Sequence, residues 1–217
     1  MTQKAGTDRT RIRRLGDRGK YEPEDLKAVL DACQTCHVAY VVDGEPRIIP
    51  TLYMRQGDYV YLHGNRQAAL LKHLGSGGFA ALSVMAVDGV VVARSGFHCS
   101  MNYRSAVLFG DGEAVPDAER EQILDAFVEA LVPGHAAAIR PATPQELAAT
   151  AVVRIPIREG SVKLRSGDAV DAEGDLLSDV WAGVIPLATA AALPQSNGDL
   201  KAGVAIPDYI EAYRPPV

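Results

Sequence analysis

The fold is decided by residues 38–63, which read VAYVVDGEPRIIPTLYMRQGDYVYLH. Val38–Val42 is rich in β-branched residues and stops at Asp43-Gly44, a dipeptide typical of two-residue hairpin turns. Arg47–Met54 returns as a second strand and ends at a glycine turn. Tyr59–His63 then runs out again, with alternate residues on opposite faces. The stretch therefore predicts three strands in an antiparallel meander.

Apolar residues three and four positions apart indicate helices in the connections. The first helix begins at Pro23, a favourable first helical residue, and runs to Cys33. Asn65 is suited to cap the second helix, because its side-chain oxygen can accept a backbone hydrogen bond, and Gly75 can end it. Two more helices are expected to begin at Pro116-Asp117 and at Thr143-Pro144.

The remaining chain reads mainly as further strands. Phe79–Val87 is expected to turn at Asp88-Gly89, a second hairpin signal, into a strand that starts at Val90. Other strands are expected over Tyr103–Val115, Ala151–Arg165 and Val180–Leu187. Many strands with few helices predict one α+β domain over residues 1–217, built as a closed or split β-barrel. Its first 20 residues are expected to form a basic arm.

Composition excludes several classes of protein. The 217 residues carry 22 lysines and arginines and 27 aspartates and glutamates, so the net charge is −5. Nucleic-acid-binding proteins usually have a basic excess. No apolar run could span a bilayer, no secretory signal opens the chain, and three cysteines favour reduced thiols. We therefore expect a cytoplasmic protein that binds neither nucleic acid nor membrane.

The motif Cys33-Gln34-Thr35-Cys36-His37 matches C-x-x-C-H, the attachment sequence of c-type haem. Such attachment requires two exposed thiols, whereas Cys33 lies on the apolar stripe of the first helix and His37 leads directly into a strand. Structural zinc requires about four ligands, and Cys99 does not complete such a set. We interpret Cys33 and Cys36 as packing residues and expect no metal site.

The strand that ends at His63 leads through Gly64-Asn65 directly into a predicted helix. Free backbone N–H groups at such a junction can bind a phosphate. Arg66 lies where a positive charge is unfavourable unless an anion is bound, and Lys72 can lean back towards it. The pattern indicates an anion site, and the alternative is a surface helix with solvated Arg66 and Lys72. The sequence has no G-x-S-x-G, Walker or G-x-G-x-x-G motif.

Several motifs occur together in an order that is specific to one family. They are Cys36-His37-Val38-Ala39, Pro46–Tyr53, Tyr61–Gly64, Ser100–Ser105 and Val180–Leu187. On these residues the chain resembles the pyridoxamine 5′-phosphate oxidase-like, FMN-binding split-barrel superfamily. It looks closest to the branch with flavin-nucleotide-binding and nitroimidazole-resistance proteins.

The resemblance implies a six-stranded split barrel and a homodimer with FMN at the interface. One strand would lie along the isoalloxazine ring, Ser105 would bond to the flavin or its phosphate, and Trp181 would cover the ring from the partner chain. The implied cofactor-binding residues are Ile48, Ile49, Pro50, Thr51, Leu52, Leu62, His63, Asn65, Arg66, Lys72, Arg104, Ser105 and Trp181.

The chain departs from the family pattern at two places. Ala68-Ala69 stands where relatives carry a basic pair in the phosphate helix, so another cofactor is an alternative to FMN. No Arg-x-His sequence closes the chain, so the vitamin B6 reaction is not expected.

We expect an FMN-dependent oxidoreductase acting on a small molecule, because the flavin supplies the redox chemistry and the protein positions it. His63 is the catalytic candidate, as a polar or proton-donating group near the ring. Its position motivates nitroaromatic reduction as a narrower version. The alternative is a non-catalytic flavin or haem binding protein for storage or sensing.

Overall fold

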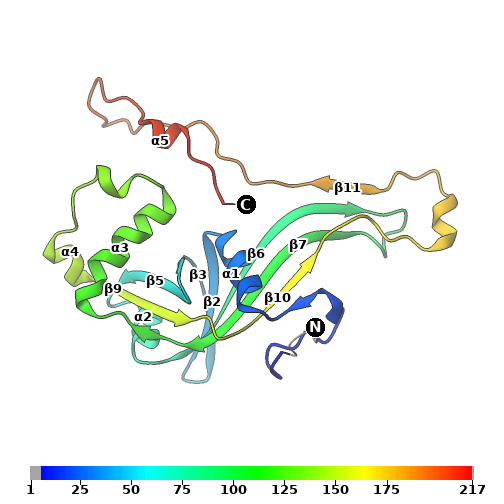
Figure 1. The fold of residues 1–217 in the computed structure, drawn as a ribbon, viewed down its shortest axis with the longest axis horizontal. Helices are drawn as coiled ribbons and strands as arrows, with labels where there is room; N and C mark the ends of the chain where they lie inside the picture. Colours follow the sequence, from blue (N-terminus) through cyan, green and yellow to red (C-terminus); the bar gives the residue numbers. More distant parts are fainter. Residues whose placement is uncertain (1–5, 217) are drawn as a thin grey trace.

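The computed structural model describes residues 6–216, which form two antiparallel sheets with helices around them (Figure 1). The larger sheet has seven strands: β1 (Gly19–Lys20), β10 (Glu159–Arg165), β7 (Ser100–Asp111), β6 (Phe79–Val92), β2 (Thr35–Val42) and β3 (Glu45–Leu52) in this order, with β11 (Gly183–Pro186) on β6. The smaller sheet has four: β4 (Met54–Gln56), β5 (Tyr59–Asn65), β9 (Thr150–Pro156) and β8 (Glu113–Ala114).

The predicted α+β class and antiparallel split β-barrel are confirmed. The barrel is open rather than closed, because its strands are divided between the two sheets. The described chain has eleven strands, more than the six that the resemblance implies: β1, β4, β8 and β11 are short, and seven longer strands remain. The Asp43-Gly44 turn between β2 and β3 has φ values of 53° and 80°, as a two-residue hairpin turn requires.

The helices form where the sequence provides starts for them. The α-helices are α1 (Pro23–Asp31), α2 (Ala69–Gly75), α3 (Asp117–Leu131), α4 (Pro144–Ala149) and α5 (Asp208–Glu211), and the 3₁₀ turns are η1 (Gly16–Arg18), η2 (Ala136–Ala138) and η3 (Glu173–Leu177). Pro23 occupies the first turn of α1, and Thr143 closes a reciprocal capping box with Glu146 at the start of α4. The predicted helices at Pro23, Pro116-Asp117 and Thr143-Pro144 are confirmed.

The main core lies between the two sheets and under α1. Leu30 of α1, Val38 of β2, Leu62 of β5 and Leu82 of β6 are each at most 1% exposed. A second cluster joins α3 to the smaller sheet, with Phe127 packed among residues of β4, β5 and β9. Burying such side chains is the main favourable term in folding, and it fixes α3 against β5.

The predicted hairpin at Asp88-Gly89 is wrong, because β6 continues through both residues. The strand absorbs them in a β-bulge, with a shift of its register against β7 between Val87 and Gly89. A Cβ atom on Gly89 would lie 3.0 Å from the carbonyl oxygen of Ile185. The missing side chain of Gly89 therefore lets the β11 backbone approach β6 closely, and Gly89 does not form a turn.

The predicted cap at Asn65 is also wrong, because Asn65 ends β5 and α2 begins only at Ala69. The Asn65 side-chain oxygen instead accepts the Gln67 N–H at 2.8 Å, which closes a local turn. The predicted strand Ala151–Arg165 is two strands, β9 and β10, separated by a turn at Ile157 and Arg158.

We call the face of the larger sheet that points away from the core the outer face. The predicted basic arm is described from Gly6 onward, and residues 1–5 lie outside the described part. Its Arg9 packs over the Phe79 ring on this face, at 4.6 Å, and pairs with Glu159 at 3.3 Å. The arm thus covers one part of the outer face and leaves residues such as Met85, 62% exposed, uncovered.

The chain after β11 leaves the sheet and crosses the molecule (Figure 1). It runs to α5 near the end of α3 and then returns towards α1, where the Tyr213 hydroxyl meets the Gln34 amide at 3.2 Å. No helix in the described part of the chain is long and apolar enough to cross a membrane.

Candidate functional site

β3 is the last strand of the larger sheet, and no strand of the described chain pairs with its free edge. Its apolar side chains are unusually accessible, with Ile48 63%, Ile49 39% and Leu52 42% exposed. An exposed edge strand offers unpaired backbone N–H and C=O groups to any flat ligand or second chain. The predicted ring-binding residues Ile48–Leu52 therefore lie where a ligand can reach their backbone.

A cavity of about 220 Å³ opens beside this edge, between β3, β5 and α2, and we call it the β3 cavity. Ile49 and Thr51 form one wall, and Leu62 and His63 form another. The cavity thus brings together four of the sequence-predicted site residues. Its remaining lining comes from Tyr40, Gly64, Ala68, Ala69, Leu70 and Leu71.

His63 also lines a second cavity, of about 260 Å³, which we call the α3 cavity. This cavity is mainly apolar, and its walls include Leu52, Leu131 and Phe127. The Phe127 ring meets the His63 imidazole edge to face, with a centroid separation of 4.3 Å. Partial burial lowers the pKa of His63 below the ordinary histidine value and favours the neutral imidazole, although the residue keeps part of its surface exposed. In the described chain no hydrogen bond is made by either ring nitrogen, so each is available to a ligand.

The basic residues near α2 are exposed and unpaired. Neither Arg66 nor Lys72 has an ion-pair partner among the residues that the structure describes. The backbone N–H of Arg66 is already bonded to the carbonyl oxygen of Ala149 at 2.9 Å. Because α2 is short and starts only at Ala69, the predicted phosphate seat of backbone N–H groups at Asn65 is not formed, and an anion here would rest on side chains.

Arg47 is a candidate that the sequence analysis missed. Arg47 opposes Tyr40 across the β2–β3 pair. It lies on the same face of β3 as Ile49 and Thr51, which line the β3 cavity, and is the next residue on that face after Ile49. Its nearest acidic partner is Glu45, at 3.7 Å, a loose pair on the surface. Alternation along β3 could have identified it, because every second residue from Thr51 back to Arg47 faces the same side.

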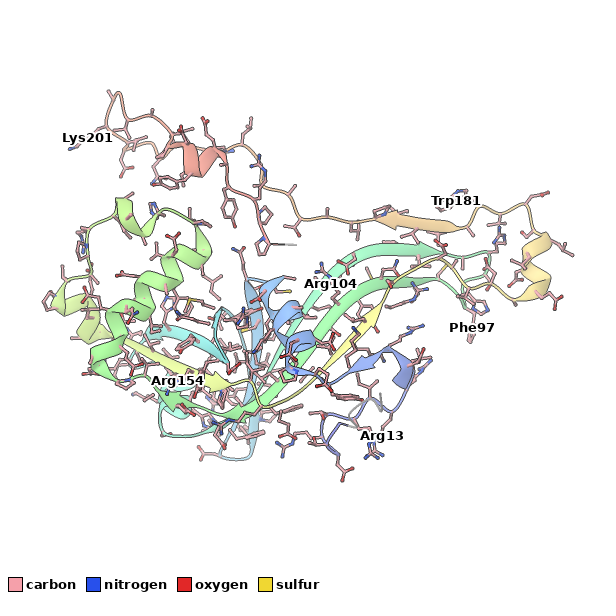
Figure 2. All side chains as sticks on the ribbon, in the orientation of Figure 1. Arg13, Phe97, Arg104, Arg154, Trp181 and Lys201 are labelled. Atoms are coloured by element: carbon pink, nitrogen blue, oxygen red, sulfur yellow. The ribbon has the colours of Figure 1, made fainter. Side chains whose placement is uncertain are left out.

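Arg104, Ser105 and Trp181 are not brought to either cavity within one chain. The Arg104 guanidinium donates to the Asp88 carboxylate at 2.8 Å, and this bond raises the pKa of Arg104. Both residues line a third cavity of about 470 Å³. We call it the Arg104 cavity. The Ser105 hydroxyl donates to the Lys163 carbonyl oxygen at 3.1 Å. Figure 2 shows Arg104 near α1 and Trp181, 62% exposed, far along the long β6–β7 hairpin.

The cysteines of the C-x-x-C-H motif are parts of the packed structure. Cys36 is 1% exposed, and burial raises the pKa of its thiol to about 12. Burial also raises the pKa of Cys33, which is half-buried just after α1. His37 lies on the next strand and opposes Pro50. In the part of the chain that the structure describes, no three potential ligands cluster for a metal ion.

Two solved structures cover nearly the whole chain. The flavocytochrome Anf3 from Azotobacter vinelandii is 36% identical over 97% of this chain and 99% of its own, with a TM-score of 0.90. The FAD and heme binding protein from Mycobacterium smegmatis is 38% identical over 91% of this chain and 98% of its own, with a TM-score of 0.87. No curated protein sequence matches the chain.

A more distant structure shares only the fold. It is a putative 5-nitroimidazole antibiotic resistance protein from Bacteroides thetaiotaomicron, 16% identical over 66% of this chain and 87% of its own, with a TM-score of 0.53. The sequence profile described as pyridoxamine 5′-phosphate oxidase matches residues 22–164, from just before α1 to the end of β10. The chain therefore belongs to the pyridoxamine 5′-phosphate oxidase family.

Proposed function

We propose that this protein is a flavin-dependent oxidoreductase whose flavin lies along β3 beside the β3 cavity. The observation that carries the proposal is the free edge of β3, with Ile48 and Leu52 exposed, next to a cavity that reaches His63. The two relatives that match almost the whole chain support it, since one is named a flavocytochrome and the other an FAD and heme binding protein.

The residues present fit a flavin nucleotide. Backbone groups on the free edge of β3 can pair with the polar edge of the ring, while Ile49 and Leu62 offer it apolar contact. Arg47, Arg66 and Lys72 are exposed cations that can pair with a phosphate or diphosphate. Ala68 and Ala69 add no charge there, so FMN, expected from the sequence, and FAD, named for one relative, are both tested below.

When bound, the flavin supplies hydride and single-electron transfer. The protein positions the ring and shields it from water. His63 contributes a neutral imidazole, because burial lowers its pKa. In that form one ring nitrogen donates a hydrogen bond and the other accepts one, so His63 can hold a proton beside the reacting molecule.

We also propose that two copies of the chain assemble through the outer face of the larger sheet. Val41, Ile48, Leu52 and Met85 leave 42–63% of their surfaces exposed near β3. Exposed apolar patches of this kind mark interfaces. Such a dimer would offer a route for the partner's Trp181 to the flavin. Sedimentation should show a dimer, and Ile48→Glu should shift it towards monomer, whereas an unchanged dimer would place the interface elsewhere.

A second candidate function, a flavocytochrome that also binds heme, is favoured by the α3 cavity. This cavity joins an apolar wall to His63, whose neutral ring nitrogens have no partner in the described chain. Neutral imidazole is a common axial ligand of heme iron. The donor chemistry of the cavity therefore suits the second cofactor that the M. smegmatis relative is named for, and an iron-bound His63 would then not be the proton-holding group beside the reactant of the flavin.

The visible spectrum of the purified protein, followed by mass measurement of the released cofactors, tests these proposals. Flavin absorbance with an FMN or FAD mass supports the first, and a Soret band supports the second. His63→Ala should abolish the Soret band and retain flavin, while the control His98→Ala, on the β6–β7 hairpin, should change neither. Protein that stays colourless and binds neither flavin in a titration would overturn the flavin proposal.

A narrower version of the oxidoreductase proposal is that the protein reduces nitroaromatic compounds. Within this chain, the position of His63 supports it. The test is anaerobic photoreduction of the flavin followed by addition of a nitroimidazole. Reoxidation of the flavin, slowed in His63→Ala, is expected. A flavin that stays reduced would end this version and leave the oxidoreductase proposal standing.

A further inference from the structure

The C-terminal segment is tied to the body at its two ends and barely touches it between them. We call residues 187–216 the strap. Its start continues β11, where the Leu187 N–H donates to the Asp88 carbonyl oxygen at 3.0 Å. Every residue from Leu187 to Ala205 is exposed, including Leu193 at 89%. From Ile206 onward half-buried residues reappear, so the strap is anchored again near its end.

Two tyrosine hydroxyls make the second anchor. Tyr209 of α5 hydrogen-bonds to Nδ1 of His135 at 3.0 Å, beyond the end of α3. Its ring stands over Gly134, where an added Cβ atom would lie 3.4 Å away. Tyr213 hydrogen-bonds to the side-chain amide of Gln34 at 3.2 Å, between α1 and β2. These two bonds connect the strap to two different parts of the body.

The space beneath the strap is not filled by side chains. A cavity of about 850 Å³ is enclosed mainly by the strap itself, with Val132 at the end of α3 as its one lining residue from the body. The Arg104 cavity, about 470 Å³, lies beneath the two ends of the strap. Protein interiors are close-packed, with few voids larger than a water molecule. A segment with so little packing belongs to the least stable part of a structure and opens locally at low cost.

Gln34 stands between this space and the candidate site. Its side chain lines the Arg104 cavity and also the α3 cavity, where His63 lies on another wall. The amide that the strap holds through Tyr213 is therefore part of the wall that separates the two cavities. If the strap lifts, Tyr213 leaves Gln34, and the amide is free to turn away from this wall.

We propose that the strap is a lid, latched by Tyr213 on Gln34 and Tyr209 on His135, beneath which the small-molecule reactant passes to reach His63. The inference rests on the proposed function for the identity of the site, because the reactant is that of the flavin. His63 is itself exposed, and a dimer through the outer face would leave the β3 cavity open on the other face of β3, so the strap controls a separate approach to His63, past Gln34.

Cys33 provides a direct probe of the lid, because its half-buried thiol lines the Arg104 cavity. Cys36 is buried, and Cys99, which is exposed, is removed by Cys99→Ser. In this background we compare labelling of Cys33 by N-ethylmaleimide and by the bulkier fluorescein maleimide, using mass spectrometry. The compact reagent can enter beneath the closed strap, whereas the bulky one requires an open strap.

Tyr213→Phe should speed labelling by fluorescein maleimide about 2- to 10-fold, the effect of losing one neutral hydrogen bond. Labelling by N-ethylmaleimide should change less. Adding Tyr209→Phe should multiply the effect. The matched control Tyr59→Phe, whose ring packs under Arg154 at 4.4 Å in the smaller sheet, should leave both rates unchanged.

Equal acceleration of both reagents with a lower melting temperature would show general loosening and overturn the lid. So would wild-type rates in the double variant. The thiol measurement needs no cofactor, so colourless protein would defeat the proposed function and leave this result valid. In flavin-loaded protein, reduction of 2,6-dichlorophenolindophenol by the photoreduced flavin should rise in Tyr213→Phe. Faster labelling without faster dye reduction would overturn the route to His63.

Discussion

Replacing Phe127 by alanine tests the central contact of the candidate site. Phe127 lies on α3, is 7% exposed and meets the His63 ring at 4.3 Å between centroids. Removing a buried phenylalanine side chain usually lowers the free energy of unfolding by about 3–5 kcal/mol. Phe127 borders the α3 cavity, so its ring has empty space on one side and fewer contacts to lose. We therefore expect a loss near the lower end, about 3 kcal/mol.

The same substitution should raise the pKa of His63 towards the ordinary value for histidine. Burial is the cause of its lowered pKa, and the Phe127 ring supplies part of that burial. Because the folded protein binds this proton less tightly than the unfolded chain, stability falls as the pH drops below the ordinary pKa. In Phe127→Ala this pH dependence of stability should become shallower.

Denaturant unfolding at several pH values measures the free energy, and an NMR titration of the histidine ring protons measures the pKa. The chain has 5 histidines, and His63→Asn identifies the signal. The matched control is Ile123→Ala, one turn earlier on α3 and also 7% exposed. It should cost about 2–5 kcal/mol without moving the pKa of His63. An unchanged His63 pKa in Phe127→Ala, or an equal shift in the control, would refute the reasoning.

Three further substitutions test the local structure. Gly89→Ala should loosen the pairing of β11 with β6, because the added Cβ would lie 3.0 Å from the Ile185 carbonyl oxygen and force a small shift, so amide hydrogen exchange in β11 should accelerate while that of β9 stays unchanged. Tyr53→Phe should lower the free energy of unfolding by about 0.5–1.5 kcal/mol, since the Leu30 carbonyl oxygen loses its side-chain donor and keeps a backbone donor; an unchanged denaturation midpoint would contradict this. Thr143→Ala removes a capping box and should cost about 0.5–2 kcal/mol. The pKa of Glu146 in that box is lowered to about 2, chiefly by its hydrogen bond to Arg140. The stability that Glu146 contributes is therefore fully present above the pKa of the unfolded chain and is lost as the pH falls towards 2. Thermal melts between about pH 5 and pH 2 check this.

The sequence predicted the elements whose signals are local. Asp43-Gly44 fixed the turn between β2 and β3, since two successive residues with positive φ leave few other conformations. Apolar spacing identified α1 and α3, because each presents one buried face. The alternating residues of Tyr59–His63 likewise predicted β5, the strand that carries His63.

The candidate site could be predicted only in part. Ile49, Thr51, Leu62 and His63 meet in one cavity as expected, because neighbouring strands bring them together. That His63 also faces the α3 cavity depends on how α3 packs against β5, a contact between segments more than 50 positions apart in the sequence. No local pattern encodes such a contact. The roles of Arg104, Ser105 and Trp181 stay predictions, since they depend on a second chain.

The predicted turn at Asp88-Gly89 and the predicted cap at Asn65, which are both wrong, lie beside cavities, and this has a physical reason. Asp88-Gly89 reads as a turn, but the bulge there leaves Asp88 to hold Arg104 at one cavity and brings β11 alongside β6. Asn65 reads as a helix cap, but its local turn delays α2 and leaves Ala68 and Ala69 uncovered at another. Local rules fail where a structure keeps space open for something else. Pro186, the last residue of β11, pairs with Gly89, and the Leu187 N–H donates to the Asp88 carbonyl oxygen, so the two residues that defeat the turn prediction hold the start of the proposed lid.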